Sequence, residues 1–381
     1  MHGASMAGRL GAVALALTAT ACAPVRPLLP SADHGTTVTL PLGLSGVTDD
    51  RRAFAAAFEQ ELRAEGRPAS VSPWLHGPSP VRDERVEGLA ARVAARAAGV
   101  SVLVVPGLFD DCFETQSVPF GDGQVRPRDL SVTEAYRQYA DLGLAGLRTV
   151  SLPGRVSSEA NGPLIAAAVR AEAARPEVRR VVIVAYSKGL PDTLRALDHL
   201  LTGPGIPAQL TDLVAVAAPV MGTPMADQGE QVFAAVSPRV RPFDCTESDG
   251  RELASLTRRE SIDWLERHPL PRGLRYHTVV AHASRQEVGP GLRPFHAFLS
   301  TFDARNDGQV LASDAVLPGS SLLAEARADH WDVALPRDRH VNAVMRAMTS
   351  GRGYPREALL RAILKWVIAG TDWHTTAVDR T

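Results

Sequence analysis

The sequence lacks the charge pattern of a nucleic-acid-binding protein. Its formal net charge is −1 at pH 7 over 381 residues, and it contains no block of basic residues. Because affinity for nucleic acids depends on clustered Lys and Arg side chains, we predict no nucleic-acid partner. The 11 histidines are scattered, and no pair stands at metal-ligand spacing on a predicted helix. We therefore predict neither a metal site nor a cofactor.

Internal repeats and low-complexity tracts are missing as well. Hydrophobic residues make up 45% of the chain and charged residues 22%, which is typical of a soluble globular protein. The length allows one large domain or two ordinary ones, with a sizeable hydrophobic core.

The N-terminal apolar run is too short to cross a bilayer permanently. Arg9 precedes the Ala- and Leu-rich residues 10–17, and small residues follow up to Ala21. A positive start, a short apolar core and small residues before a cleavage site are typical of a secretory signal. We predict a signal peptide over residues 1–21 and, from the Pro and small residues that come next, a tether over residues 22–35.

Cysteine is rare, with three residues in the chain, and the first of them follows the predicted signal. Cys22 comes directly after Ala19-Thr20-Ala21, which resembles a bacterial lipobox, although Leu is usual at position 19. That resemblance implies a lipid on Cys22 that anchors the exported protein to the periplasmic face of a bacterial membrane. Ala23, in place of Asp, favours the outer membrane. The alternative is plain cleavage, with loss of Cys22.

The two other cysteines, Cys112 and Cys245, remain in the mature chain. In an oxidising compartment such a pair is readily interpreted as a disulfide. The alternative is two separate buried thiols.

Short apolar strands alternate with amphipathic helices along most of the chain, which predicts an α/β fold with a mostly parallel, doubly wound sheet covered on both faces. Residues 222–273 are polar and helical in pattern and stand between two strands, which predicts a helical cap insertion in a single domain over residues 36–381. The predicted strands are residues 36–40, 100–105, 147–152, 181–184, 213–217 and 276–281, and the predicted helices are residues 49–64, 86–98, 130–144, 162–174, 190–201, 342–348 and 357–368.

The most informative pattern surrounds Ser187. A β-branched run over residues 181–184 is followed by a sharp turn with this serine at its centre and then by a predicted helix over residues 190–201. Small residues, Ala185 and Gly189, stand two positions away on either side. Such a turn strains the serine backbone and leaves no room for large neighbours, while it lifts the hydroxyl clear of the sheet. Ser187 is therefore predicted to be a nucleophile.

A serine is a poor nucleophile near neutral pH unless a base lies within hydrogen-bond reach and a third group orients that base. Both follow in the order serine, acid, histidine. Asp307 lies in an Asn-Asp-Gly turn, and His330 lies in a loop before the last helices. The rival candidates are Asp303, Asp314 and Asp332 for the acid, and His277, His282, His296 and His340 for the base.

Three of these motifs resemble those of bacterial lipases in the α/β-hydrolase superfamily. They are the turn around Ser187, the Asn-Asp-Gly-x-Val sequence around Asp307 and the Asp-His dipeptide that ends at His330. Residues 217–227 are similar to the segment that those lipases carry after the next strand. The resemblance covers roughly residues 100–340, and it implies that the serine, the aspartate and the histidine form a catalytic triad.

An oxyanion hole needs two backbone N–H groups aimed at the developing charge. One would be that of Lys188, directly after the nucleophile, and the resemblance implies that Leu108 supplies the other. Two departures from the family pattern are Ala185 in place of Gly, and Pro106-Gly107 in place of His-Gly.

Three roles are open for the Lys188 side chain. It could hold an anionic substrate group, or it could pair with Asp110 or Asp111. The third role is an ion pair with Asp192, one helical turn further along.

The sequence thus predicts an exported serine hydrolase that cleaves carboxylic esters, small-molecule or lipid-like, through an acyl-enzyme intermediate. One alternative is acyl transfer to an acceptor other than water, which would use the same residues. Another is a non-catalytic exported binding protein that kept the fold.

Overall fold

The computed structural model describes most of the chain beyond its N-terminal segment. The described residues are 37–39, 45–77, 79–81, 83–112, 116–125, 132–236, 245–340 and 342–370. The predicted signal peptide, the tether and Cys22 lie outside them. Within these ranges, no helix is both long and apolar enough to cross a membrane.

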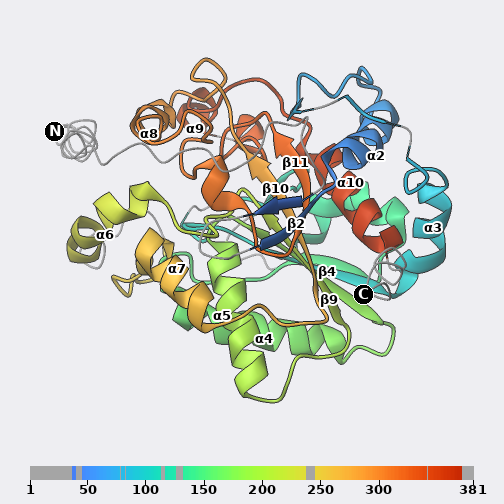
Figure 1. Cartoon of the computed structure of the whole chain (residues 1–381), viewed down its shortest axis with the longest axis horizontal. Helices are drawn as coiled ribbons and strands as arrows, with labels where there is room; N and C mark the ends of the chain where they lie inside the picture. Colours follow the sequence, from blue (N-terminus) through green and yellow to red (C-terminus); the bar gives the residue numbers. More distant parts are fainter. Residues whose placement is uncertain are drawn as a thin grey trace.

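A mostly parallel sheet forms the centre of the molecule, as predicted (Figure 1). Its strand order is β1-β2-β11-β10-β9-β8-β4-β7, and β3 pairs with β11. In this spatial order, each strand from β2 at one end to β7 at the other is parallel to its neighbours in that run. Strand β1 is antiparallel to β2, and β3 is antiparallel to β11. The strands are β1 (Thr37–Thr39), β2 (Ser45–Asp49), β3 (Leu75–His76), β4 (Val100–Val105), β7 (Gly146–Thr149), β8 (Arg180–Tyr186), β9 (Leu210–Val216), β10 (Arg275–Ala281) and β11 (Ser321–Ala326), with a separate pair β5 (Gln116–Ser117) and β6 (Gln124–Val125).

Helices cover both faces of the sheet, and the side chains of β4 divide between them. Val102 and Val104 belong to the core cluster with α2, α3 and α10, whereas Leu103 and Val105 belong to the cluster with α4 and α5. Because both faces are buried, this strand is buried at every position and, apart from Ser101, is apolar instead of alternating. In Figure 1, α2, α3 and α10 lie on one side of the sheet and α4 and α5 on the other. The helices are α2 (Arg51–Ala64), α3 (Leu89–Arg96), α4 (Ser158–Ala173), α5 (Gly189–Thr202), α8 (Arg293–Leu299), α9 (Ala343–Ala347) and α10 (Arg356–Ala369).

Strand β11 was not predicted, although it lies inside the sheet between β10 and β2. Its sequence, Ser-Leu-Leu-Ala-Glu-Ala, contains no β-branched residue and favours a helix on intrinsic propensity. Pairing with two neighbouring strands and full burial override that preference.

The predicted helix over residues 130–144 is only partly correct. The structure has a 3₁₀ helix, η3 (Val132–Leu142), that is interrupted by non-helical backbone at Tyr136. The hydroxyl of this tyrosine donates to the carbonyl of Pro119 at 3.1 Å and lies 2.6 Å from Oγ1 of Thr149. Contacts with a loop and with β7 therefore fix the ring at the point where the helix breaks.

The insertion predicted over residues 222–273 lies between β9 and β10, and the structure describes helices in part of it. It contains α6 (Pro224–Val236), η5 (Ala254–Leu256) and α7 (Arg258–Arg267), while residues 237–244 lie outside the described part. Figure 1 shows α6 and α7 on the same side of the molecule as α5. Its role as a cap stays a prediction.

Candidate active site

The turn after β8 places Ser187 in a strained conformation. Its φ of 54° lies in the left-handed region, which L side chains rarely adopt. The serine N–H donates to the carbonyl of Val216 at 3.1 Å, and its carbonyl accepts from the N–H of Leu190 at 3.1 Å. The end of β9 and the start of α5 thus hold the turn in place.

Two glycines make room for this turn. A Cβ atom on Gly189 would stand 2.5 Å from the carbonyl oxygen of Val105 and 2.6 Å from that of Pro106, both backbone atoms at the end of β4. A Cβ atom on Gly107 would stand 3.0 Å from Cβ and 3.4 Å from Oγ of Ser187. The small residue that the sequence pattern required at position 189 therefore corresponds to a real close approach between α5 and the end of β4.

The three predicted catalytic residues lie together at the carboxyl edge of the sheet. Nε2 of His330 is 2.8 Å from Oγ of Ser187, and Nδ1 of the same ring is 2.7 Å from Oδ2 of Asp307. All three are buried. Because the carboxylate accepts a hydrogen bond from the Nδ1–H group, Nε2 is left to accept a hydrogen bond from the serine hydroxyl. Serine, histidine and aspartate thus form one continuous hydrogen-bonded chain.

The Asn-Asp-Gly turn fixes the carboxylate of Asp307. Its Oδ1 accepts from the N–H groups of Gln309 at 2.8 Å and Val310 at 2.7 Å, which leaves Oδ2 for the histidine. Gly308 has a φ of 91°, and its N–H donates to Oδ1 of Asn306 at 3.0 Å. The turn chemistry seen in the sequence therefore orients the acid directly.

Two residues that the sequence analysis did not assign hold the histidine loop. Asp329 accepts N–H groups from Trp331 and Asp332 through Oδ1, and from Gly289 through Oδ2, at 2.8–3.0 Å. Tyr186 donates its hydroxyl to the carbonyl of His330 at 2.6 Å. The aspartate could have been recognised from its place in the Asp-His dipeptide, whereas nothing in the sequence marks the contact of the tyrosine.

The rival acids have other partners. Asp314 forms an ion pair with Arg258 at 3.2 Å, and burial raises its pKa to about 7. Asp332 contacts the hydroxyl of Ser350, and burial together with the charge of Asp329 raises its pKa to about 7. Asp303 accepts from the N–H of Arg305 at 2.9 Å.

The rival histidines are also bound to other groups. His277 lies 3.2 Å from Asp212, and His282 lies 3.1 Å from Glu325. The ring of His296 is 2.9 Å from the carbonyl of Ala283, and that of His340 accepts from the N–H of Asn342 at 3.1 Å. Among the candidate bases, His330 is the one that the structure places at hydrogen-bond distance from Ser187 within its described residues.

The two predicted oxyanion donors are Leu108, in the loop after β4, and Lys188, directly after the serine. Among the described residues, their main-chain N–H groups donate to no protein acceptor. The Lys188 side chain is buried and forms an ion pair with Asp192, with Nζ 2.6 Å from Oδ1. Of the three roles considered for this lysine, the structure therefore shows the pair with Asp192.

A cavity of about 390 Å³ opens above the serine, and its lining is predominantly apolar. Leu108, Ser187 and His330 line it together with aromatic, Met and Leu side chains. The apolar part of the lining consists of Phe109, Phe295, Trp331, Leu335, Met345 and Met348. Such a cavity can accept an apolar group next to the hydroxyl and cover most of the surface of that group.

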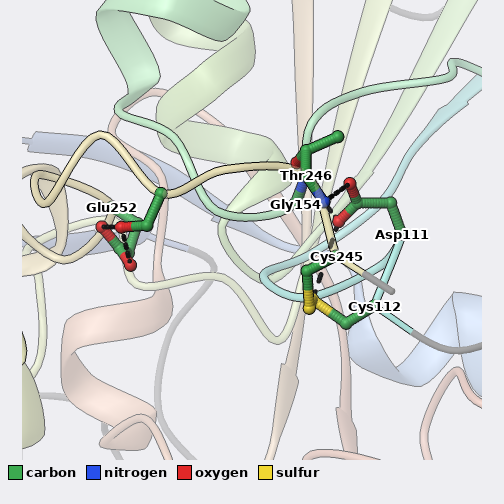
Figure 2. Close-up of a disulfide and its surroundings, with 7 residues drawn as sticks. Asp111, Cys112, Gly154, Cys245, Thr246 and Glu252 are labelled. Atoms are coloured by element: carbon green, nitrogen blue, oxygen red, sulfur yellow. Dashed lines mark hydrogen bonds between the residues drawn. A yellow bond between two sulfur atoms is a disulfide. The ribbon is translucent and has the colours of Figure 1, made fainter. Parts of the chain in front are cut away.

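Cys112 and Cys245 form a disulfide, as the sequence predicted (Figure 2). It joins the loop after β4 to the insertion across 133 positions of sequence, and both cysteines line the cavity. In the part of the chain that the structure describes, no group of three or more His, Cys, Asp or Glu side chains is arranged to hold a metal ion.

No protein-family model and no curated protein matches the chain. The crystal structure of a metagenomic carboxyl esterase is similar to it, with 28% sequence identity and a TM-score of 0.70, over 94% of this chain and 98% of that one. A Bacillus licheniformis lipase in its mature form shares 20% identity at a TM-score of 0.48, over 70% of this chain and 92% of that one. A Staphylococcus hyicus lipase shares 11% identity at a TM-score of 0.48, over 71% of this chain and 96% of that one. With the sheet order, the first likeness identifies the α/β-hydrolase fold.

Proposed function

We propose that this protein is a serine hydrolase that cleaves carboxylic esters through an acyl-enzyme intermediate. The observation that carries the proposal is the chain of hydrogen bonds from Ser187 through His330 to Asp307, at 2.8 and 2.7 Å, on a strained turn below an apolar cavity. The likeness to a carboxyl esterase over almost the full length of both chains supports the same class of reaction.

In the acylation step, Ser187 Oγ attacks the ester carbonyl while Nε2 of His330 takes the hydroxyl proton. The imidazolium that forms is stabilised by Asp307, which also keeps the proton of the neutral ring on Nδ1. The histidine then protonates the leaving alcohol, and the acyl group stays on the serine. In the second half, the histidine activates water, which releases the acid and restores the serine.

The tetrahedral intermediates place a negative charge on the former carbonyl oxygen. In this proposal the main-chain N–H groups of Leu108 and Lys188 receive that charge, because both donors are without a protein acceptor in the described structure. Loss of one such donor costs about 3 kcal/mol of transition-state stabilisation. Because both are backbone groups, replacement of either side chain does not test them.

The apolar lining of the cavity supports an acyl ester with a hydrophobic chain as substrate. Rates over a series of p-nitrophenyl esters of increasing chain length test this part. We expect esters of medium-chain acids to be cleaved with a higher kcat/KM than acetate, and turnover restricted to acetate would contradict it.

Export and a membrane anchor belong to the same proposal. The sequence of residues 1–22 supports a cleaved lipoprotein signal with a lipid on Cys22, and the disulfide suits an oxidising compartment such as the periplasm. We propose that the enzyme is anchored in the outer membrane and acts on its periplasmic side. Intact mass of the membrane-extracted protein should show the acyl additions on Cys22, and an unmodified N-terminus would contradict the anchor.

A fluorophosphonate probe tests the chemistry. We expect the full-length protein to be labelled, and Ser187→Ala and His330→Ala to lose the label while they remain folded. An unlabelled wild-type protein would overturn the proposal in favour of a non-catalytic binding protein. Product analysis with added alcohols then separates hydrolysis from acyl transfer, since transfer yields a new ester instead of the free acid.

A further inference from the structure

The loop that carries Leu108 is joined to two distant segments of the chain. The N–H of Phe109, the next residue, donates to the carbonyl of Gly154 at 2.9 Å. In return, the N–H of Gly154 donates to Oδ1 of Asp111 at 2.8 Å. This reciprocal pair connects the loop after β4 with the loop that follows β7.

The second carboxylate oxygen of Asp111 reaches the insertion. Its Oδ2 accepts from the N–H of Thr246 at 3.1 Å, next to the disulfide between Cys112 and Cys245. Figure 2 shows the Asp111 carboxylate facing the neighbouring backbones of Gly154 and Thr246, close to the disulfide. One carboxylate and one disulfide thus fasten three segments at a single point.

The backbone in this loop is not relaxed and has little freedom to shift. Phe109 has a φ of 65°, which is unfavourable for an aromatic residue and requires surrounding contacts to hold it. A Cβ atom on Gly154 would stand 2.3 Å from Oδ1 of Asp111, 2.8 Å from the N atom of Asp110 and 3.0 Å from the carbonyl carbon of Phe109. The two loops therefore touch backbone to backbone.

We propose that Asp111 and the Cys112–Cys245 disulfide are positioning groups that hold the N–H of Leu108 in place for the oxyanion. This proposal rests on the proposed function, because it assigns a role within the same reaction. The hydrogen bonds of Asp111 go to the backbones of Gly154 and Thr246, and the disulfide joins the residue after it to the insertion, so we infer that both act through the loop. Reduction of the disulfide to two thiols by a dithiol reagent should consequently lower the rate of an enzyme whose triad is intact.

The kinetic test compares Asp111→Ala, Asp111→Asn and the double variant Cys112→Ser/Cys245→Ser with wild type, each normalised by active-site titration. We expect kcat to fall roughly 10- to 100-fold in the alanine variant with little change in KM, since a displaced loop loses an interaction specific to the transition state. Affinity for a trifluoromethyl ketone, which forms a tetrahedral adduct, should fall in parallel. The asparagine variant keeps one acceptor oxygen and should lie between alanine and wild type.

Asp249→Ala is the matched control. The carboxylate of Asp249 accepts from the N–H of Ser157 at 2.6 Å, so it holds the same part of the insertion without contacting the loop of Leu108. We expect kcat of this variant to stay within about twofold of wild type. Equal losses in Asp249→Ala and Asp111→Ala would mean that general loosening of the insertion, and not the position of Leu108, lowers the rate. If the double serine variant does not fold, dithiothreitol treatment of wild type followed by reoxidation tests the disulfide reversibly.

Hydrogen exchange tests the positioning role without any turnover. Peptides that cover residues 107–112 should exchange at least tenfold faster in Asp111→Ala and in the reduced wild type, with the peptides of β4 and β8 unchanged. Unchanged exchange in this loop would overturn the proposal even for an active enzyme. A different outcome is a protein that the probe does not label but whose loop exchanges faster as expected. It would overturn the proposed function, while Asp111 and the disulfide would keep their role in holding the loop.

Discussion

The two sides of the proposed active site are held in different ways. On the nucleophile side, backbone geometry fixes the position of the reacting group, with Ser187 at positive φ and Gly189 packed against the end of β4. On the oxyanion side, side chains hold the loop of Leu108, through the Asp111 carboxylate and the disulfide between Cys112 and Cys245. Changes on the first side should therefore act on folding or abolish the chemistry, whereas changes on the second should lower the rate in steps.

The largest effect is expected on the nucleophile side, from removal of the reacting groups. Ser187→Ala and His330→Ala should each lower kcat by about 10⁴-fold or more, because the members of a triad act as a unit. Hydrolysis of p-nitrophenyl butyrate measures this, and the exposed His199→Ala on α5 serves as the histidine control. Retention of more than a hundredth of the wild-type rate in either variant would contradict the assignment.

Gly189→Ala tests the backbone of the same side. The added methyl group would approach the carbonyl oxygens of Val105 and Pro106 to 2.5 and 2.6 Å, so the end of β4 must move. We expect a loss of about 1–3 kcal/mol in the free energy of unfolding, measured by urea denaturation. Gly229→Ala on α6 is the control, because a Cβ atom there meets nothing within 4 Å and alanine favours a helix. Equal stability of the two variants would show that the close packing at the turn is not needed.

Asp329→Asn probes the loop that carries His330, with a smaller expected effect. The carboxylate accepts three main-chain N–H groups, and an amide would direct its NH₂ group at one or two of these donors. We expect kcat to fall about tenfold because His330 is displaced. We expect no pH at which the variant regains the wild-type kcat. Steady-state kinetics of Asp329→Asn beside Asp332→Asn checks it, and equal rates of the two variants would refute a special role for Asp329.

The smallest effect concerns Asp110, on the oxyanion side. Burial raises the pKa of its carboxyl group to about 7, with Asp111 acting in the same direction and the hydrogen bond from Gln116 opposing it. Between the ordinary pKa of an aspartate and pH 7, the folded protein therefore holds a proton that the unfolded chain has released, so this group destabilises the fold as pH rises. Asp110→Asn should remove that loss.

Thermal unfolding at pH 4.5 and pH 8 measures this prediction. Asp110→Asn should have a higher Tm than wild type at pH 8, and the difference should shrink at pH 4.5. Asp198→Asn on α5 controls for the loss of one carboxylate. A difference that does not depend on pH would contradict the assignment to Asp110.

The nucleophile side could be predicted from the sequence because its determinants are local. A β-branched strand, small residues around Ser187 and a helix follow one another within about 20 positions, and each has a conformational preference of its own. The Asn-Asp-Gly turn at Asp307 is local in the same sense. The structure brings both to His330 at hydrogen-bond distance, which the order of motifs indicated but local patterns alone could not fix.

The remaining features depend on contacts between distant segments. Strand β11 has a helix-favouring sequence and becomes a strand through its neighbours in the sheet. The two roles of the Asp111 carboxylate require Gly154 and Thr246, one on each side of it, and neither residue carries a recognisable motif. The pairing of Cys112 with Cys245 was predictable only because no other cysteine remained after Cys22.

Tyr186 and Ser187 are adjacent in the chain, and the hydroxyl of the tyrosine holds the carbonyl of His330 at 2.6 Å. The end of β8 therefore carries the nucleophile and also, through the phenol of the tyrosine, holds the backbone of the base. Loss of this phenolic contact should therefore loosen the base relative to the nucleophile while both reacting side chains stay unchanged.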